Sequence, residues 1–383
     1  MMSNLAQTEP QTPQHADARS GTVADALGVV VIGRNEGERL RRCLGALAGC
    51  AASVVYVDSG SSDGSPALAR SLGVDVVELD RSSPFTAARG RQAGLDHLLR
   101  IRPALEFIQF IDGDCTLAPG WLDAAAASLQ SNPRAAAVCG RLREEHSERS
   151  LYSRIVDVQW DAPPVTATGD RSFAGAQEIG HFGGIAILRV EAITAAGGWP
   201  QDLIAGEEPD LSFRLRGRGW TILRLPRDMA LHDIAMTRLS QYWRRAVRTG
   251  HAYAEVAARH ASGPSRDAAR PWTRHVLSIS VYGLLLPLGI ITCVAAALPV
   301  QRLRLPAAAG LLVIFFLYAR MWASNVRFCL RHGRRFSFAV AYAAVETVGK
   351  FGQAAGLLKY WTGRLRRRRS GIIEYKRPEP RAT

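Results

Sequence analysis

The stretch Phe107-Ile108-Gln109-Phe110-Ile111-Asp112-Gly113-Asp114 decides how the fold of this chain is interpreted. Four of its first five residues are large and apolar, a pattern that predicts a buried strand. The strand ends in two carboxylates separated by a glycine, and Asp and Gly are common in simple turns. Mg²⁺, however, is usually bound by one or two carboxylates together with phosphate oxygens. The stretch therefore predicts either a turn or a metal site.

Strands and helices alternate around this stretch. Apolar runs predict strands at residues 29–33, 53–57 and 74–79, and helical patterns follow them. The alternation predicts an α/β domain with a Rossmann-like, mostly parallel central sheet, in which ligands bind at the carboxyl ends of the strands. Polar residues follow three of these strands: Arg34-Asn35-Glu36, Asp58-Ser59 and Asp112-Gly113-Asp114. We expect a nucleotide site at this edge, although no glycine-rich phosphate loop of the common kinds is present.

Three acids lie within four residues further along the chain. Glu207, Glu208 and Asp210 stand at the predicted start of a helix, where acids often serve only to complement the helix dipole. The alternative is a catalytic role. His232 follows a predicted strand at 220–225, and a lone histidine is more often structural than a ligand. Residues 165–178 are polar and contain glycine, so we expect a mobile loop there.

The net charge of +14 raises the question of an anionic partner. Two clusters carry much of the excess, one at residues 327–335 and one at 364–369, and both follow apolar segments. An anionic membrane surface explains them better than nucleic acid does. The six cysteines are scattered without CxxC pairs, which predicts free thiols in a reducing compartment. Residues 1–25 are polar and lack a signal-peptide core, so we expect a disordered extension.

The C-terminal region is predicted to contact a membrane. Residues 276–298 form a run of 23 residues without a charge, and 305–323 form a second apolar run. They predict a transmembrane hairpin, with a soluble helical core as the alternative. Residues 336–361 are apolar but contain Glu346, Lys350 and Lys359, which favours an interfacial helix over a third span. The expected organisation is a catalytic domain at 26–262, a membrane region at 272–361 and a basic tail at 362–383.

Four motifs resemble those of glycosyltransferase family 2, inverting nucleotide-sugar enzymes with the GT-A fold. The resemblance covers residues 27–260 and rests on these segments: Val29-Val30-Val31-Ile32-Gly33-Arg34-Asn35-Glu36, Val57-Asp58-Ser59-Gly60-Ser61-Ser62-Asp63-Gly64, Ile111-Asp112-Gly113-Asp114, and Gly206-Glu207-Glu208-Pro209-Asp210-Leu211 with Arg214-Leu215. Any one motif is weak, but all four occur in the family's order and spacing. The appended hairpin resembles membrane-associated members of the family.

The resemblance implies a role for each candidate residue. The set expected to bind the nucleotide sugar is Arg34, Asn35, Glu36, Asp58, Ser59, Arg89, Arg91, Asp112 and Gly113. Asp112, Asp114 and His232 are expected to bind Mg²⁺ or Mn²⁺, which neutralises a diphosphate leaving group. The general base is expected among Glu207, Glu208 and Asp210. Glu208 stands where family members commonly have an Asp, which leaves the other two open.

The function expected from the resemblance is transfer of a single sugar from a nucleotide-diphosphate sugar to a lipid-linked or cell-surface glycan acceptor. Gln241-Tyr242-Trp243-Arg244-Arg245 matches the signature of processive synthases only loosely, because its Trp and Arg are out of order. The positive-inside rule places the catalytic domain on the cytoplasmic side of an inner membrane that the chain crosses more than once. The alternatives are a nucleotidyltransferase and a catalytically silent membrane scaffold that binds a nucleotide or glycolipid.

Overall fold

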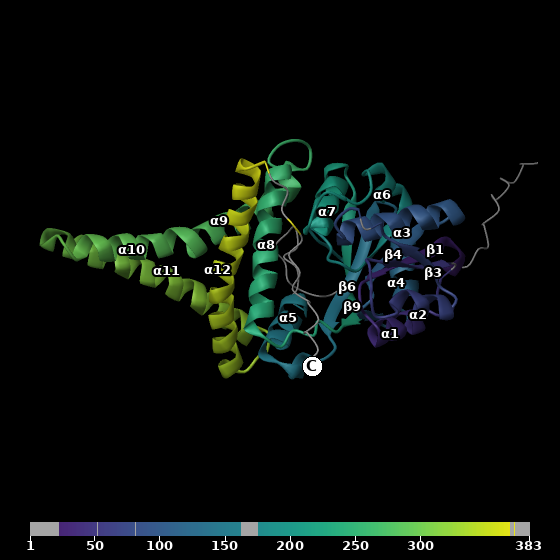
Figure 1. Cartoon of the computed structure of the whole chain (residues 1–383), viewed down its shortest axis with the longest axis horizontal. Coiled ribbons are helices and arrows are strands. Elements are labelled where there is room, and N and C mark those ends of the chain that lie inside the picture. The colour runs from purple at the N-terminus through teal and green to yellow at the C-terminus, as the bar shows by residue number, and fades with distance from the viewer. Residues whose placement is uncertain (1–22, 52, 81, 162–174, 368–370, 372–383) are drawn as a thin grey trace, which may run out of the picture.

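The structure is a computed structural model that describes residues 23–51, 53–80, 82–161, 175–367 and 371. The α/β domain lies at one end of the molecule and a long helical hairpin projects from the other (Figure 1). The first half of the sheet is parallel, in the order β3-β2-β1-β4. Its strands are β1 (Leu27–Gly33), β2 (Ser53–Asp58), β3 (Asp75–Glu78) and β4 (Phe107–Asp112). The predicted strand at the opening stretch is confirmed.

The second half of the sheet is mixed. β8 (Ala186–Arg189) pairs antiparallel with β4, so the parallel pairing stops there. The sheet continues through β6 (Ala135–Glu144), β9 (Thr221–His232) and β5 (Cys115–Leu117), and β7 (Gln177–Glu178) pairs with β9. The predicted α/β class with a GT-A-like sheet is confirmed, with more antiparallel pairing than the sequence suggested.

Helices cover the sheet and bury its apolar residues in one large core. They are α1 (Glu38–Ala46), α2 (Ser65–Ser71), α3 (Ala87–Ile101), α4 (Trp121–Ser131), α5 (Leu151–Asp161), α6 (Val190–Ala195) and α7 (Glu207–Gly217). Helix α3 lies very close to the sheet, since a Cβ at Gly94 would overlap the side chain of Val30. This close packing fixes the side chains of α3 relative to the strand ends.

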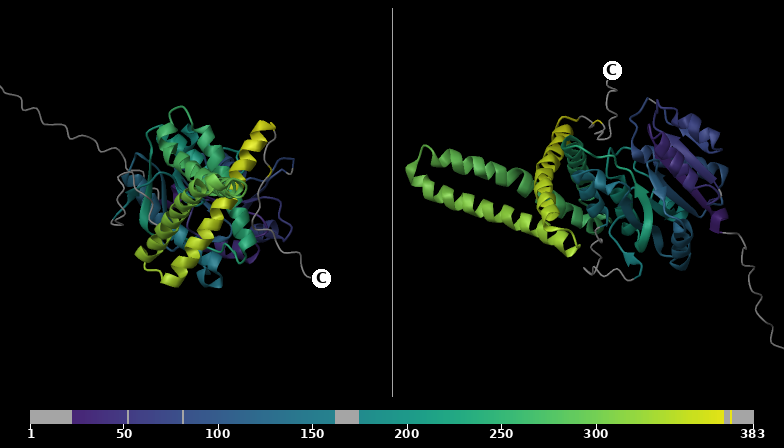
Figure 2. Two further views of the ribbon diagram at one scale, coloured as in Figure 1. Left: turned by 90° about the vertical axis from the view of Figure 1, so that its left-hand side faces the viewer. Right: turned by 90° about the horizontal axis from the view of Figure 1, so that it is seen from below.

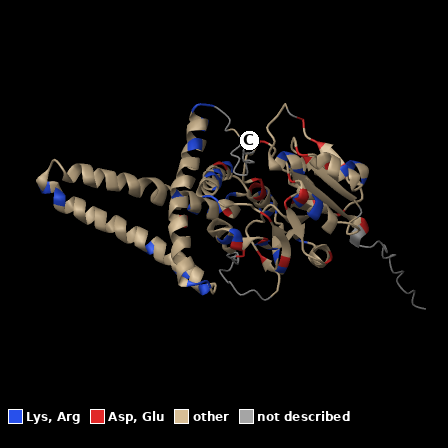
Figure 3. Cartoon of the chain, turned by 60° about the horizontal axis from the view of Figure 1, so that its bottom comes forward, with Lys and Arg blue, Asp and Glu red and all other residues tan. Residues whose placement is uncertain are grey.

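The C-terminal half is helical. Its elements are α8 (Leu239–Arg259), α9 (Arg266–Ser280), a π-helical turn at Val281–Leu285, α10 (Leu286–Ala297), α11 (Arg304–Arg331) and α12 (Phe336–Leu365). Within the part of the chain that the structure describes, two helices are long and apolar enough to cross a membrane, Arg266–Ala297 and Gln301–Arg331, and both are largely exposed. Figure 3 shows few charged residues along this hairpin and basic residues at its tip, where the chain carries Arg302 and Arg304.

Helix α12 packs along α8 (Figures 1 and 2). The two backbones touch, since a Cβ at Gly250 would overlap the carbonyl oxygen of Gln353 and one at Gly356 that of Val247. Close backbone approach through glycine is typical of tightly associated helices. The segment at 336–361 is therefore a packed helix, which begins at the expected residue and continues past residue 361 to Leu365.

Three expected boundaries differ from the structure. The basic tail expected from residue 362 begins inside α12, which continues to Leu365. Residues 23–25 of the expected disordered extension belong to a short 3₁₀ helix, Val23–Ala26, while residues 1–22 lie outside the described residues. Of the mobile loop expected at 165–178, residues 165–174 lie outside the described residues and Gln177–Glu178 form β7. The pairing of β7 with β9 explains why this last part is not a loop.

Candidate active site

Three parallel strands end side by side at one edge of the sheet. In the register of the sheet, Gly33 of β1 is opposite Asp58 of β2, and Ile32 of β1 is opposite Asp112 of β4. The polar segments that follow the three strands therefore converge, as the sequence predicts. Carboxyl ends of parallel strands are where α/β proteins bind ligands.

Arg91 of α3 connects the end of β4 to the start of α7. Its Nη1 lies 2.8 Å from Glu207 Oε1 and 3.2 Å from Glu208 Oε1. Its Nη2 donates to Asp112 Oδ1 at 3.0 Å and to the carbonyl oxygen of Gly184 at 3.1 Å. The guanidinium is buried, so these partners satisfy a charge that water does not reach. One arginine thus binds three of the candidate acids together.

Glu208 is the more accessible acid of the pair at the start of α7. Its side chain is 16% exposed, whereas that of Glu207 is 4% exposed. Burial and the neighbouring charge of Glu207 raise the pKa of Glu208 to about 7, against the opposing effect of Arg91. A carboxyl group with a pKa near neutrality can accept a proton at physiological pH and is suited to general-base chemistry.

Asp210 lies in a different environment from the other two acids. Its Oδ2 accepts from Arg214 Nε at 2.9 Å, and its Oδ1 lies 3.0 Å from His260 Nε2 and 3.3 Å from Arg259 Nε. Burial would raise the pKa of Asp210, but the hydrogen bond with His260 and the two arginine charges outweigh it and lower the pKa. Asp210 is therefore an ionised residue that ties α7 to α8.

Asp114 and His232 form the candidate metal site. Strand β5 pairs with β9 so that Cys115 is opposite His232, and this brings His232 Nε2 within 3.1 Å of Asp114 Oδ2. Cis ligands of an octahedral ion held at roughly 2.1 Å lie about 3 Å apart, so the two donors fit a divalent cation. Burial lowers the pKa of His232, which favours the neutral imidazole that ligates metals.

The donor atoms of Asp114, Cys115 and His232 lie within 4.8 Å of one another. Burial raises the pKa of the Cys115 thiol well above its ordinary value, so Cys115 stays protonated and is a poor ligand. Among the described residues, Asp112 is not part of this group, because its carboxylate faces Arg91. The structure thus brings together two of the three predicted metal ligands.

Asp58 and Asn35 shape the loops that follow β2 and β1. Asp58 is buried, and its Oδ2 accepts from the amides of Gly60 and Ser61 at 2.8 Å each. Asn35 has a φ of 57°, which Asn tolerates better than most residues, and its Oδ1 accepts from the amide of Ser62 at 2.7 Å. In this structure both side chains hold the 58–62 turn in place.

The other predicted nucleotide-binding residues surround this turn. Arg34 is exposed and its guanidinium lies 5.8 Å from the centre of the Phe85 ring. Glu36 forms an ion pair of 2.8 Å with Arg39. Arg89 donates to the carbonyl oxygens of the loop at residues 80–84. Arg34 and Arg89 thus both contact the segment that precedes α3.

Ser59 and Gly113 contribute through their backbones. The amide of Ser59 donates to the carbonyl oxygen of Gly33 at 3.0 Å, and the amide of Gly113 donates to that of Ile32 at 2.8 Å. These bonds continue the pairing of β1 with β2 and with β4 past the ends of those two strands. The backbone at these positions therefore sets where the loops leave the sheet.

Two residues of the site were not anticipated from the sequence. A Cβ at Gly184 would lie 3.1 Å from Arg91 Nη2 and 3.2 Å from Asp112 Oδ2, so glycine leaves room for the ion pairs. The indole ring of Trp160 on α5 stacks on His232, with ring centres 4.7 Å apart. The Gly183-Gly184 pair was a visible signal of close packing, whereas nothing local to Trp160 points to His232.

The sequence of residues 28–194 matches the family described as Glycosyl transferase family 2. Residues 28–194 therefore resemble glycosyltransferase family 2, and the mixed sheet of the α/β domain is GT-A-like. A similar protein is the pre-mycofactocin glycosyltransferase of Mycobacterium tuberculosis, which is 26% identical over 260 residues. The alignment covers 66% of this chain and 50% of that protein, so the chain spans about half the length of the curated relatives it matches.

A solved structure with a similar fold is that of the mannosyltransferase PcManGT from Pyrobaculum calidifontis in complex with GDP-Man and Mn²⁺. It is 18% identical in sequence, superposes with a TM-score of 0.52, and the match covers 85% of this chain and 88% of that one. At this identity the likeness concerns the fold.

Proposed function

We propose that this protein is a membrane-bound, inverting glycosyltransferase that moves a single sugar from a nucleotide-diphosphate sugar to a hydroxyl group of a lipid-linked or cell-surface glycan. The observation that carries the proposal is the position of Glu208, a carboxyl group with a pKa near 7 that Arg91 holds beside Asp112 at the end of β4. The match of residues 28–194 to the family and the Mn²⁺ and GDP-Man bound to PcManGT support it.

Asp114 and His232 are the residues that would hold the divalent metal, Mg²⁺ or Mn²⁺. Their donors are 3.1 Å apart and buried, which suits two ligands of one ion. When bound, such an ion neutralises the charge of a departing diphosphate. Asp112 differs from the expectation, since Arg91 fixes its carboxylate, and we assign it to positioning the donor sugar next to Glu208.

Glu208 acts as the general base in this proposal. Inverting transfer needs one carboxylate that removes the proton of the acceptor hydroxyl while its oxygen attacks the anomeric carbon. Glu207 is less exposed and 2.8 Å from Arg91, so it holds the arginine in place. Asp210 already binds three cationic or histidine side chains, which leaves it no role at the reacting atoms.

The nucleotide occupies the edge formed by the ends of β1, β2 and β4 in this proposal. Arg34, Asn35, Glu36, Asp58 and Ser59 border that edge, and their loops are held by bonds within the protein. The apolar α9–α11 hairpin anchors the enzyme in the inner membrane, with the basic residues near α11 and α12 on the cytoplasmic side together with the catalytic domain.

The test compares Glu208→Gln with Glu207→Gln in detergent-solubilised full-length protein. A panel of nucleotide sugars is screened for release of the nucleoside diphosphate, with calorimetry of nucleoside diphosphate binding in Mn²⁺. Glu208→Gln should lose turnover by a factor of about 10² to 10⁴ and keep nucleotide affinity. Unreduced turnover in Glu208→Gln would refute its role as base. Nucleotide binding by the wild-type protein without turnover of any donor would favour the silent scaffold instead.

A further inference from the structure

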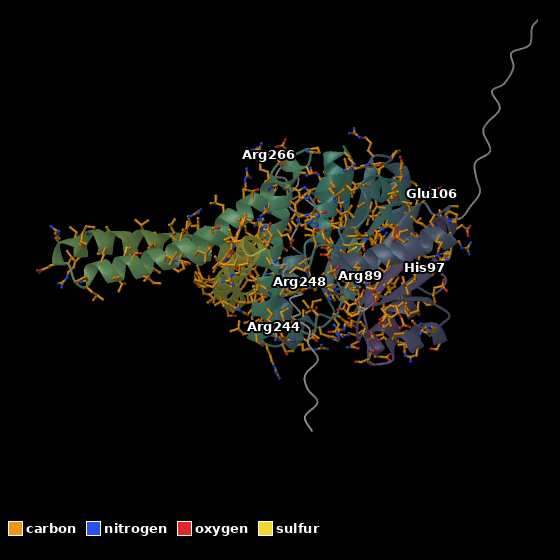
Figure 4. All side chains as sticks on the ribbon, turned by 45° about the horizontal axis from the view of Figure 1, so that its top comes forward. Arg89, His97, Glu106, Arg244, Arg248 and Arg266 are labelled. Carbon is orange, nitrogen blue, oxygen red and sulfur yellow. The ribbon has the colours of Figure 1, made fainter. Side chains whose placement is uncertain are left out.

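A cavity of about 560 Å³ lies between the α/β domain and the C-terminal helices. One wall consists of the start of α3 with the loop before it, and of the 201–204 loop that leads into α7. The other wall consists of His251 and Glu255 of α8 and of Tyr360 and Arg364 at the end of α12. Its volume is within the range of cavities that hold small molecules. Figure 4 labels Arg89, which lines this cavity from α3.

The cavity and the candidate active site share two elements, α3 and the segment that leads into α7. Arg89 is two residues before Arg91 on α3, and Ile204 is four residues before Glu208. Neither Arg91 nor Glu208 lines the cavity, so an acceptor bound there would have to extend beyond the cavity to bring a hydroxyl group to Glu208. The end of α12 with the exposed Trp361 borders the other side, and an exposed Trp beside arginines is typical of a membrane interface.

The charged groups of the lining balance one another. Arg89 donates to the carbonyl oxygens of the 80–84 loop, and Asp202 is bound by Arg259 through two hydrogen bonds of 2.6 and 3.2 Å. Arg364 donates to the Tyr360 hydroxyl at 2.9 Å. With two arginines and two carboxylates in the lining, neither sign of charge dominates. The cavity therefore does not select for a highly charged ligand.

Glu255 is the acid that remains available to a ligand. Its Oε2 is buried and accepts no hydrogen bond from the residues that the structure describes, and the closest cationic or histidine atom recorded is His251 Nδ1 at 3.5 Å. Burial raises the pKa of Glu255 to about 7 and lowers that of His251 to about 4. Near neutral pH the wall thus offers the neutral imidazole of His251, a partly protonated carboxyl group, a phenol and an amide, which together donate and accept hydrogen bonds.

We propose that this cavity binds the sugar headgroup of the acceptor, a neutral polyhydroxylated group attached to a membrane lipid. Glu255 and the Tyr360 hydroxyl bind its hydroxyl groups, and the Tyr360 ring covers one face. The proposal rests on the glycosyltransferase function above and adds the place and the chemistry of the acceptor. Alternating donors and acceptors without a net charge suit hydroxyl groups, because each hydroxyl both donates and accepts.

The test measures binding of methyl glycosides by saturation-transfer NMR, with methyl α-D-mannopyranoside, methyl β-D-glucopyranoside and methyl β-D-galactopyranoside as probes. The variants are Glu255→Ala and the conservative Tyr360→Phe, and Glu191→Ala, at an exposed residue of α6, is the control. Calorimetry with UDP and GDP in Mn²⁺ checks that each variant is folded. The wild-type protein and the control should bind at least one glycoside, and Glu255→Ala should weaken it about tenfold or more with unchanged nucleotide affinity.

Two results would overturn the proposal. The first is a wild-type protein that binds nucleotide but none of the three glycosides. The second is glycoside binding that is equal in wild type, Glu255→Ala and Tyr360→Phe. Glycoside binding that depends on Glu255, in a protein that neither binds nucleotides nor turns over any donor, would refute the glycosyltransferase function and leave the sugar site standing. The two failures are therefore distinguishable.

Discussion

Replacing Arg91 by methionine tests the ion-pair network at the centre of the site. Methionine is close to arginine's aliphatic part in shape but leaves Glu207, Glu208 and Asp112 without their common cation. Removing one partner of a buried ion pair costs about 3 to 5 kcal/mol, because the other charge stays buried. Glu207 is buried and incurs most of this cost, while the side chain of Asp112 is 34% exposed and contributes little.

The loss of folding stability in Arg91→Met should depend on pH. Arg91 lowers the pKa of Glu208, so without Arg91 that pKa rises further above 7. A carboxyl group whose folded pKa exceeds its unfolded value binds more protons when folded, and its folded state loses stability as pH rises between the two values. One pKa unit corresponds to about 1.4 kcal/mol. Because the wild type already loses part of this stability between pH 6 and pH 7, the stability gap between wild type and Arg91→Met should widen by about 1 kcal/mol from pH 6 to pH 8.

The assay is thermal unfolding of the detergent-solubilised proteins, followed by tryptophan fluorescence at pH 6 and pH 8 with EDTA present. At roughly 2 to 4 °C per kcal/mol, Arg91→Met should melt roughly 6 to 20 °C below wild type at pH 8 and closer to it at pH 6. Arg89→Met is the matched control, since its guanidinium binds backbone carbonyl oxygens and its cost should not change with pH. Equal stability of Arg91→Met and wild type at both pH values would refute the reasoning.

Three further predictions concern the pH profile, the docking of α12 and the metal site. Turnover of the wild type should rise about tenfold per unit as pH approaches 7 from below, because Glu208 must lose its proton to act as base; a flat profile from pH 5.5 to 8 would contradict this. Tyr242→Phe removes the hydrogen bond of 2.5 Å to Glu346 Oε1 on α12 and should lower stability by about 1 to 3 kcal/mol in denaturant unfolding; an unchanged midpoint would show that this bond does not help to dock α12. Trp160→Ala should weaken Mn²⁺ binding about 10- to 100-fold in calorimetry, because the indole orients the His232 ring, whereas Trp160→Phe should weaken it less; equal affinity in both variants would contradict that role.

The parallel half of the fold follows from local patterns in the sequence. Apolar runs mark β1, β2 and β4, and the polar residues after them converge because parallel strands end at one edge. The mixed second half could not be predicted in the same way, since its strands pair across large distances in sequence. Residues 165–174 of the expected loop lie outside the described residues.

The different roles of Glu208 and Asp210 could be predicted in part from the sequence. At 100° per residue, Glu208 and Asp210 lie about 160° apart around α7, so they could not both have faced one ligand. By contrast, the different roles of Asp112 and Asp114 depend on the pairing of β5 with β9, which brings His232 to Asp114. That contact spans 118 positions, and no local pattern indicates it.

The spacing of glycines in α12 indicates that this helix packs closely on another, although its overall composition does not. Gly349, Gly352 and Gly356 recur three and four residues apart, a spacing that places them on one face of the helix. Side chains of α8 contact the first two, and its backbone contacts the third. Glu346 stands on the same helix and accepts from Tyr242, so this acid is a docking contact that only the structure assigns.

Calorimetry of UDP and GDP binding, with Mn²⁺ and with EDTA, tests the central claim most directly. The wild-type protein should bind one of the two nucleotides with Mn²⁺ present and at least tenfold more weakly in EDTA. Asp114→Asn, which keeps the side-chain size but removes the ligand charge beside His232, should bind equally weakly in both conditions. Nucleotide affinity that is independent of Mn²⁺, or that is unaffected by Asp114→Asn, would contradict a metal-dependent nucleotide-sugar site at the end of this sheet.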